Sequence, residues 1–167
     1  MTLFLIGMMG SGKSYWAKQL ATALQYELVD LDRVIENENN ATISEIFEMY
    51  GEQFFRNQET KYLRNFDTKN NVVLATGGGT ACFNDNMQWM NEQGITIWID
   101  EPIDVLVNRL VKEKAHRPLI KNLNDAELKY FLEQKLQQRK PFYSKAKFII
   151  SSKEDTTEKL IQLLNLI

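Results

Sequence analysis

The sequence predicts an α/β fold built on a mainly parallel sheet, and three observations support this prediction. Short apolar runs alternate with helical patterns along the chain, as expected for strands joined by crossover helices. The first run is continuous rather than alternating, which is typical of strands buried on both faces. Most runs end at or near glycine or aspartate. Parallel sheets bind ligands beyond the carboxyl ends of their strands, so these ends are the places where a site is expected.

The order of the apolar runs defines the expected elements. We expect five strands, at 3–6, 27–30, 72–75, 95–99 and 148–150. Apolar residues at helical spacing predict helices between and after them, at 17–24, 42–68 with a break at Gly51, 105–111 after Pro102, 125–138 and 156–166. The polar stretch 112–125 is expected to be a loop. The chain is therefore interpreted as one domain spanning 1–167, in which helices flank the sheet.

Composition excludes several classes of protein. The 167 residues are 44% apolar and 25% charged, and 20 Lys and Arg against 22 Asp and Glu give a net charge of −2. This balance disfavours a strongly basic nucleic-acid binder. A single cysteine, Cys82, and a single histidine, His116, leave neither an internal disulfide nor a His/Cys zinc cluster. With no run long enough for a membrane span and no signal peptide, we expect a soluble cytoplasmic protein, with Cys82 as a small buried residue.

The strongest motif follows the first strand. Residues 7–14 read GMMGSGKS and match the phosphate-loop pattern G-x-x-x-x-G-K-[ST] in full. Glycines let the backbone point several N–H groups at phosphate oxygens, and a helix N-terminus adds partial positive charge. Lys13 can reach the β- and γ-phosphates, and the Ser14 hydroxyl can bind Mg²⁺. The motif predicts a nucleoside-triphosphate site but does not identify the acceptor.

Two weaker signals lie at the ends of the second and third strands. Asp30 and Asp32 provide carboxylates that could hold Mg²⁺ through water and accept a proton from an attacking hydroxyl. An Asx turn or a helix cap explains the same pair equally well. The run Gly77–Gly79 could bring backbone N–H groups close to a ligand, or form only a flexible turn.

The other signals are basic. Arg56 could bind a carboxylate or phosphate, although a surface ion pair with Glu59, three residues on, is the simpler explanation. Arg117 lies in the polar loop and could close over a phosphate site or be one solvated cation among several. Arg139 could bind an anion or complement a helix C-terminus. Tyr143 is interpreted as a packing residue.

Taken together and in order, these segments resemble the shikimate kinases, small kinases of the nucleoside-monophosphate-kinase-like phosphate-loop group. The matching segments are GMMGSGKS at 7–14, DLD at 30–32, GEQFFRNQE at 51–59, TGGGT at 76–80, HRPL at 116–119 and RKPFY at 139–143. The resemblance covers essentially the whole chain. It implies a three-layer phosphate-loop kinase fold with a five-stranded parallel sheet, a small helical substrate-binding insertion at about 31–60 and a lid at about 112–124.

The resemblance also implies an activity and a nucleotide site. The activity is ATP-dependent phosphorylation of the 3-hydroxyl of shikimate, giving shikimate 3-phosphate and ADP on the route to chorismate and aromatic amino acids. Mg²⁺ would be held by Ser14 and, through water, by Asp30. Arg117 would close with the lid onto the phosphates and act in catalysis beside Lys13. The ATP phosphates would be bound by Gly10, Ser11, Gly12, Lys13, Ser14 and Tyr15.

On the acceptor side, the resemblance implies that Asp32 binds the reacting hydroxyl and is the candidate base. The shikimate carboxylate would be bound by Arg56 and Arg139. The remaining implied contacts are backbone N–H groups of Gly77, Gly78 and Gly79, and the aromatic walls Phe47 and Phe55. The resemblance makes Arg109, on the helix before the lid, a candidate for the arginine that lies against adenine in this family, but Arg109 and the adenine-side segment 151–155 stay unassigned.

Rival interpretations share the scaffold or only the phosphate loop. A gluconate kinase or a nucleoside-monophosphate kinase would not need this full set of motifs. A regulatory NTPase switch would be expected to carry a guanine-selective N-K-x-D motif, which the sequence lacks. The expected partners are shikimate and ATP alone, with no nucleic acid and no membrane. A monomer is expected because no long exposed apolar stripe stands out.

Overall fold

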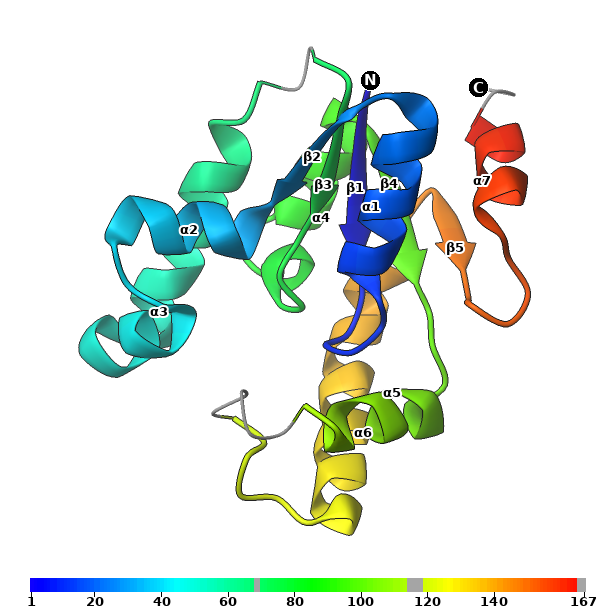
Figure 1. Cartoon of the computed structure of the whole chain (residues 1–167). Coiled ribbons are helices and arrows are strands. Elements are labelled where there is room, and N and C mark those ends of the chain that lie inside the picture. Colours follow the sequence, from blue (N-terminus) through cyan, green and yellow to red (C-terminus); the bar gives the residue numbers. More distant parts are fainter. Residues whose placement is uncertain (68–69, 114–118, 165–167) are drawn as a thin grey trace.

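The computed structural model describes residues 1–67, 70–113 and 119–164 and contains a five-stranded sheet with helices on both faces (Figure 1). The strands run parallel in the order β2-β3-β1-β4-β5. Their bounds are β1 (Thr2–Ile6), β2 (Glu27–Asp30), β3 (Val72–Ala75), β4 (Ile95–Ile99) and β5 (Phe148–Ile150). All five expected strands are confirmed, as is the α/β class.

The helices are α1 (Lys13–Leu24), α2 (Leu31–Asn39), α3 (Ile43–Arg64), α4 (Asn86–Gln93), α5 (Ile103–Val111), α6 (Asp125–Tyr143) and α7 (Thr157–Leu164), with a 3₁₀ turn, η1, at Thr80–Cys82. Capping boxes begin α3, at Thr42 and Glu45, and α6, at Asn124 and Glu127. The break expected at Gly51 is present, because Gly51 has φ 79° and ψ 173° inside α3.

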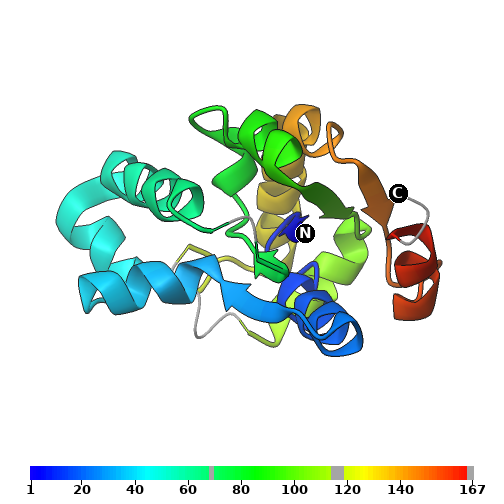
Figure 2. The ribbon, with the colours of Figure 1, turned by 90° about the horizontal axis from the view of Figure 1, so that it is seen from above.

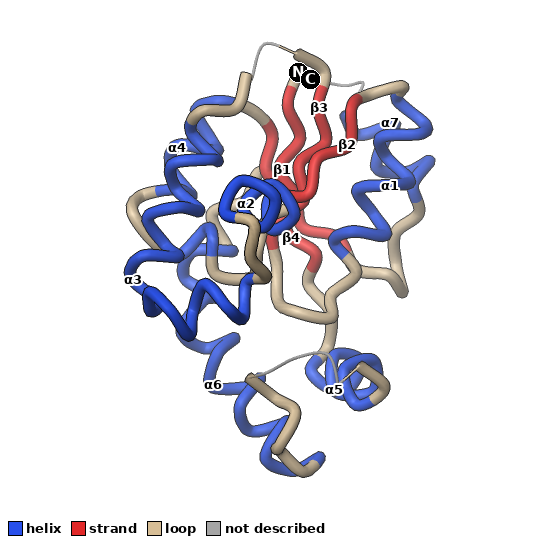
Figure 3. The backbone as a smooth tube through the Cα atoms, turned by 60° about the vertical axis from the view of Figure 1, so that its left-hand side comes forward, coloured by secondary structure: helices blue, strands red, loops and turns tan. Residues whose placement is uncertain are grey.

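The core lies on both faces of the sheet because side chains alternate along each strand. Leu3 and Leu5 pack toward α1 and α7, whereas Phe4 and Ile6 pack toward α4 and α6. Figure 2 and Figure 3 show the same division, with α1 and α7 on one face and α4 and α6 on the other. This arrangement brings the carboxyl ends of β1, β2 and β3 together at one end of the sheet. Nearby, α2 contacts α3, and both α3 and α6 contact η1.

The sequence interpretation was wrong about the end of α6 and missed one helix, α4. We expected α6 to end at Gln138, but it continues through Pro141 to Tyr143. The fully buried Tyr143 ring packs against Trp98, with ring centroids 5.7 Å apart, and this packing offsets the helical hydrogen bond that a proline removes. The helix α4 was not identified, and α2 was given no bounds of its own, although it lies within the helical insertion expected at about 31–60. The extra turn of α6 places Arg139 and Tyr143, four residues apart, on one face of the helix.

Candidate active site

The phosphate loop curls between β1 and the N-terminus of α1. Gly10 and Gly12 have φ values of 75° and 91°, which favour glycine. A side chain at position 10 would also lie 2.9 Å from Leu110 Cγ. Lys13 Nζ donates to the backbone carbonyls of Gly7 at 3.0 Å and Met8 at 2.9 Å. The ammonium group is thereby held over the loop, where it can meet a phosphate.

A cavity of about 590 Å³ opens above this loop. We call it the phosphate-loop cavity. It is lined by Met9–Trp16, Asp30, Asp32, Ala75–Gly78, Arg109, Glu113 and Ser152. Every residue from Gly10 to Tyr15 that was assigned to phosphate binding lies on its wall. Because α1 has no side-chain cap at its start, its first N–H groups are available to an anion.

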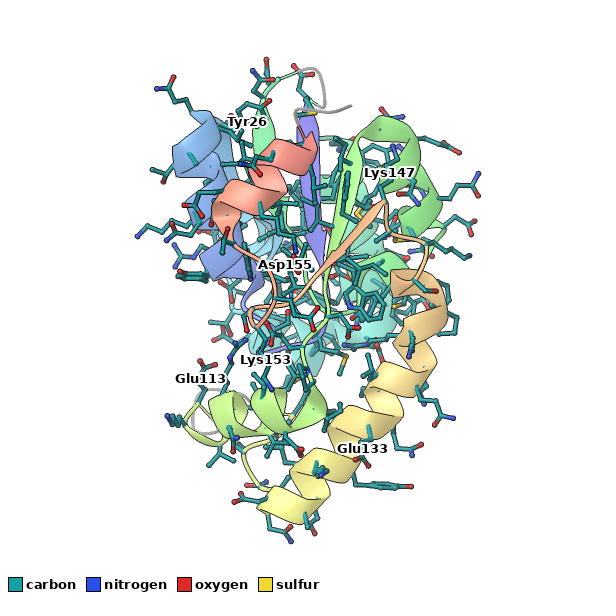
Figure 4. The ribbon with its side chains drawn as sticks, turned by 90° about the vertical axis from the view of Figure 1, so that its right-hand side faces the viewer. Tyr26, Glu113, Glu133, Lys147, Lys153 and Asp155 are labelled. Carbon is teal, nitrogen blue, oxygen red and sulfur yellow. The ribbon has the colours of Figure 1, made fainter. Side chains whose placement is uncertain are left out.

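Arg109 and the loop after β5 close one side of the phosphate-loop cavity, although sequence reasoning left both unassigned. Arg109 Nη1 donates to the carbonyls of Gly10 and Ser11, each at 3.1 Å. Its Nη2 donates to Ser152 Oγ at 3.1 Å and lies 3.8 Å from the buried Glu101 Oε1. Figure 4 shows this loop, labelled at Lys153 and Asp155, passing close to α5. An isolated arginine carries no motif, so this contact was not readable from the sequence.

The two aspartates after β2 have different environments. Asp30 is the N-cap of α2, and its Oδ1 accepts hydrogen bonds from the N–H groups of Asp32 at 3.1 Å and Arg33 at 3.3 Å. Asp32 Oδ1 is buried and has no hydrogen-bond partner among the described residues. Burial, followed by the charges of Glu59 and Asp30, raises the pKa of Asp32 from 3.8 to about 6. The helix-cap interpretation therefore holds for Asp30, while Asp32 is left with an uncommitted oxygen.

The oxygens at this edge suit Mg²⁺, which prefers hard oxygen ligands and keeps several waters and substrate phosphates around it. Ser14 is exposed in the phosphate-loop cavity, and Asp30 and Asp32 line the same cavity. The described residues hold no cluster of three or more acidic, histidine or cysteine ligands. The donor set therefore fits a cation bound mainly through phosphate and water, and does not fit an all-protein cage.

A second cavity of about 720 Å³ adjoins the first and shares Met9, Asp32, Gly77 and Gly78 with it. We call it the arginine cavity. Arg56 and Arg139 both line it, as do Phe47 and Phe55. The side chains assigned to the acceptor, which come from α2, α3, the β3–η1 turn and α6, are thus brought together around one space.

Arg56 and Glu59 form a buried ion pair, so the surface ion pair that the sequence suggested for them is wrong; the second partner of Arg56, Glu52, has a side chain that is 59% exposed. Arg56 Nη1 donates to Glu59 Oε2 at 2.7 Å, and its Nε and Nη2 donate to Glu52 Oε1 at 3.3 and 3.2 Å. Arg56 is 8% exposed and Glu59 is fully buried. The guanidinium carbon also lies 4.5 Å from the centre of the Phe83 ring. Buried ion pairs of this kind fix a guanidinium in one orientation.

The glycine run fits closely between these groups. A side chain at Gly77 would lie 2.6 Å from Glu59 Oε1, and one at Gly79 would lie 2.6 Å from Arg56 Nη1. At Gly78, a side chain would lie 3.0 Å from Arg139 Nη1. The run therefore needs glycine for close approach, and it lies directly beside both arginines.

Comparison with known proteins agrees with this architecture. The model of the family "Shikimate kinase" matches residues 9–165. The chain belongs to the shikimate kinase family. A shikimate kinase from Phocaeicola vulgatus is 42% identical over 160 residues, which cover 96% of this chain and 91% of that protein.

Solved shikimate kinases also share the fold. One from Bacteroides thetaiotaomicron superposes with a TM-score of 0.93 at 37% identity, covering 99% of this chain and 98% of the other. Another, from Acinetobacter baumannii in complex with shikimate, gives a TM-score of 0.84 at 34% identity, covering 99% and 91%. The resemblance inferred from the motifs is thereby confirmed, and the chain is an enzyme of the shikimate kinase type with the phosphate-loop kinase fold.

Some expected features of a shikimate kinase lie outside the described residues. Arg117 and His116 are among them, as is the middle of the expected lid. Of the described residues next to the lid, Leu119 and Ile120 line the arginine cavity.

Cys82 is half-buried, and burial raises the pKa of its thiol to about 11. Within the described ranges, no helix combines the length and apolarity that a bilayer crossing requires.

Proposed function

We propose that this chain transfers the γ-phosphoryl group of ATP to the 3-hydroxyl of shikimate. The observation that carries the proposal is the position of Asp32, which lines both cavities. A carboxylate at that junction can accept a proton from a hydroxyl in the arginine cavity while the phosphoryl donor occupies the phosphate-loop cavity. Family membership and the Acinetobacter baumannii relative in complex with shikimate support this acceptor.

On the nucleotide side, the ATP phosphates bind the N–H groups from Gly10 to Tyr15, and Lys13 offsets the charge that develops on the transferring group. When bound, Mg²⁺ would be held by Ser14 and, through water, by Asp30, and would neutralise negative charge on the phosphates. We further propose that 112–124 acts as a lid that brings Arg117 to the phosphates, within a single domain spanning 1–167.

On the acceptor side, the shikimate carboxylate binds Arg56 and Arg139, the N–H groups of Gly77–Gly79 donate to the ring substituents, and 31–60 supplies most of the remaining wall. In the transfer step, the acceptor oxygen forms a bond to the γ-phosphorus as the bond to the ADP oxygen breaks. The hydroxyl proton passes to Asp32. Near neutral pH most Asp32 is ionised, since its pKa is about 6, so the base is available.

We also propose that the enzyme is a monomer that acts in the cytoplasm. The single cysteine among 167 residues suits a reducing compartment.

An ADP-release assay with ATP and Mg²⁺ across shikimate, gluconate and nucleoside monophosphates tests the proposal. We expect ADP release when shikimate is the acceptor, and none with gluconate or a nucleoside monophosphate, because two arginines suit one small carboxylate. Product analysis should place the phosphate on the 3-hydroxyl. Turnover with gluconate or a nucleotide, and none with shikimate, would overturn the assignment of the acceptor.

A further inference from the structure

The backbone hydrogen bonds of the glycine run, Gly77–Gly79, suggest a role for Tyr143, which takes no part in the phosphoryl transfer proposed above. All three carbonyls of the run accept hydrogen bonds. Thr80 N–H donates to Gly77 at 3.3 Å and Cys82 N–H donates to Gly79 at 2.9 Å. The remaining carbonyl, that of Gly78, accepts from the Tyr143 hydroxyl. Two of the three bonds are local to the η1 turn, whereas the third comes from α6, 65 residues away.

The N–H groups of the same glycines show the opposite pattern. Within the described ranges, none of them donates to a backbone or side-chain acceptor. A run whose carbonyls each accept a hydrogen bond already, and whose N–H groups donate none, presents mainly hydrogen-bond donors to a ligand. That polarity suits hydroxyl and carboxylate oxygens, which accept hydrogen bonds.

The Gly78 carbonyl and the Gly79 N–H belong to one planar peptide unit and point in opposite directions. Rotating that unit by half a turn would exchange them and present a carbonyl oxygen where the donor had been. Glycine on both sides makes this rotation easy, because glycine adopts positive and negative φ almost equally. Holding the Gly78 carbonyl toward α6 therefore directs the Gly79 N–H away from α6.

Tyr143 is well placed to hold the carbonyl. Its side chain is fully buried, and its ring packs against Trp98 at 41°. Its hydroxyl lies 3.9 Å from Met8 Sδ in the phosphate loop. Burial raises the pKa of the phenol above its usual range, so the hydroxyl keeps its proton and remains a donor. Arg139, one turn earlier on α6, reaches the same loop, with Nη1 at 3.8 Å from Met8 Sδ.

We propose that Tyr143 is a positioning residue that fixes the Gly78–Gly79 peptide with its N–H directed at the acceptor. The proposal rests on the proposed function, since it assigns these donors to shikimate. One turn of α6 then supplies both the arginine for the acceptor carboxylate and the hydroxyl that orients the backbone donors.

The variant Tyr143→Phe tests this role because it removes the hydroxyl and keeps the buried ring. We expect the KM for shikimate to rise about tenfold, the worth of one well-placed hydrogen bond, while the KM for ATP stays within about twofold. Tyr130→Phe is the matched control, since Tyr130 is on the same helix and 64% exposed; it should change neither constant. A folded Tyr143→Phe enzyme with an unchanged shikimate KM, or with equal rises in both constants, would overturn the proposal.

A second measurement uses the wild-type enzyme and does not depend on whether the variant folds. With only eight glycines in the chain, ¹⁵N-glycine labelling gives a sparse amide spectrum. Shikimate should shift the Gly79 amide resonance, and a resonance that stays in place while calorimetry shows binding contradicts the proposal. Failure of the proposed function has a different signature, namely no shikimate binding and no ADP release by the wild type.

Discussion

The two cavities that meet at Asp32 are built in different ways. The phosphate-loop cavity takes the largest share of its lining from one contiguous stretch, 9–16, whose proposed binding groups are backbone N–H groups and Lys13. The arginine cavity is lined by several segments that are far apart in the chain, and its charged side chains include the buried Arg56 and Glu59 and the partly buried Arg139. A phosphate chain is bound by a local loop, whereas a small hydroxylated carboxylate needs side chains whose positions depend on the whole fold.

The difference extends to electrostatics. In the phosphate loop, Lys13 donates hydrogen bonds to the backbone carbonyls of Gly7 and Met8. In the arginine cavity, Glu59 accepts hydrogen bonds from both Arg56 and Thr80, the latter at 2.5 Å. Burial raises the pKa of Asp32, and the charge of Glu59 raises it further. Glu59 thus fixes the guanidinium and tunes the candidate base at the same time. Changes in the arginine cavity should therefore affect turnover, acceptor binding and stability, while leaving nucleotide binding intact.

The largest expected effect is on turnover. Asp32→Asn removes the proton acceptor and should lower kcat by about 10²- to 10⁴-fold, the usual contribution of a positioned base. ATP affinity, measured by calorimetry, should change little because phosphate binding rests on the loop. Glu38→Gln is a matched control on the same helix, exposed and outside both cavities. Near-normal turnover in Asp32→Asn would show that Asp32 is not the proton acceptor. It would also contradict the expectation that changes in the arginine cavity lower turnover while nucleotide binding stays intact.

A smaller effect is expected on acceptor binding. Arg139→Ala should weaken shikimate binding by about ten- to a hundredfold, because hydrogen bonds to charged groups contribute about 1.5–3 kcal/mol. ATP binding should stay within about twofold. Calorimetric titrations with each ligand measure both, with the exposed neighbour Lys140→Ala as the control. Equal losses for the two ligands would show that Arg139 supports the phosphate loop through its Met8 contact instead.

The sequence predicted the phosphate-loop cavity more readily than the arginine cavity. The phosphate loop was readable because its chemistry depends on residues that are adjacent in the chain, and the strands were readable because continuous apolar runs reflect burial on both faces. The order of the weaker motifs identified the family. Individually, however, Arg56 was indistinguishable from a surface residue, because its burial depends on Phe83, Glu59 and the glycine run packing around it.

The features that the sequence did not predict depend on distant contacts. Arg109 reaches the phosphate loop from 98 residues away, and Tyr143 reaches Gly78 across 65 residues. The mixed polar and apolar residues of α4 gave no clear periodicity. A proline near the end of α6 suggested termination, and only the packing of Tyr143 on Trp98 explains why the helix continues.

The smallest expected effect concerns stability. Because the pKa of Asp32 is raised in the folded protein, its ionised form is disfavoured there relative to the unfolded chain. The penalty is absent below pH 3.8, develops between pH 3.8 and about 6, and is complete above that range. The full difference corresponds to about 3 kcal/mol, but a buried amide must also find hydrogen-bond partners. We therefore expect Asp32→Asn to raise the free energy of unfolding by about 1 kcal/mol at pH 8.

Urea unfolding of the wild type and of Asp32→Asn at pH 4.5 and pH 8 measures this effect, and the gain should be smaller at the lower pH. Ser14→Ala provides the comparison from the phosphate-loop cavity, where an exposed hydroxyl does not ionise; its effect should be the same at both pH values. A stabilised but inactive Asp32→Asn enzyme would show that the arginine cavity retains an unfavourable buried charge for the sake of catalysis. A variant that is less stable at pH 8 would mean that the Asp32 carboxylate supports the fold, and that the two cavities differ less than their charges suggest.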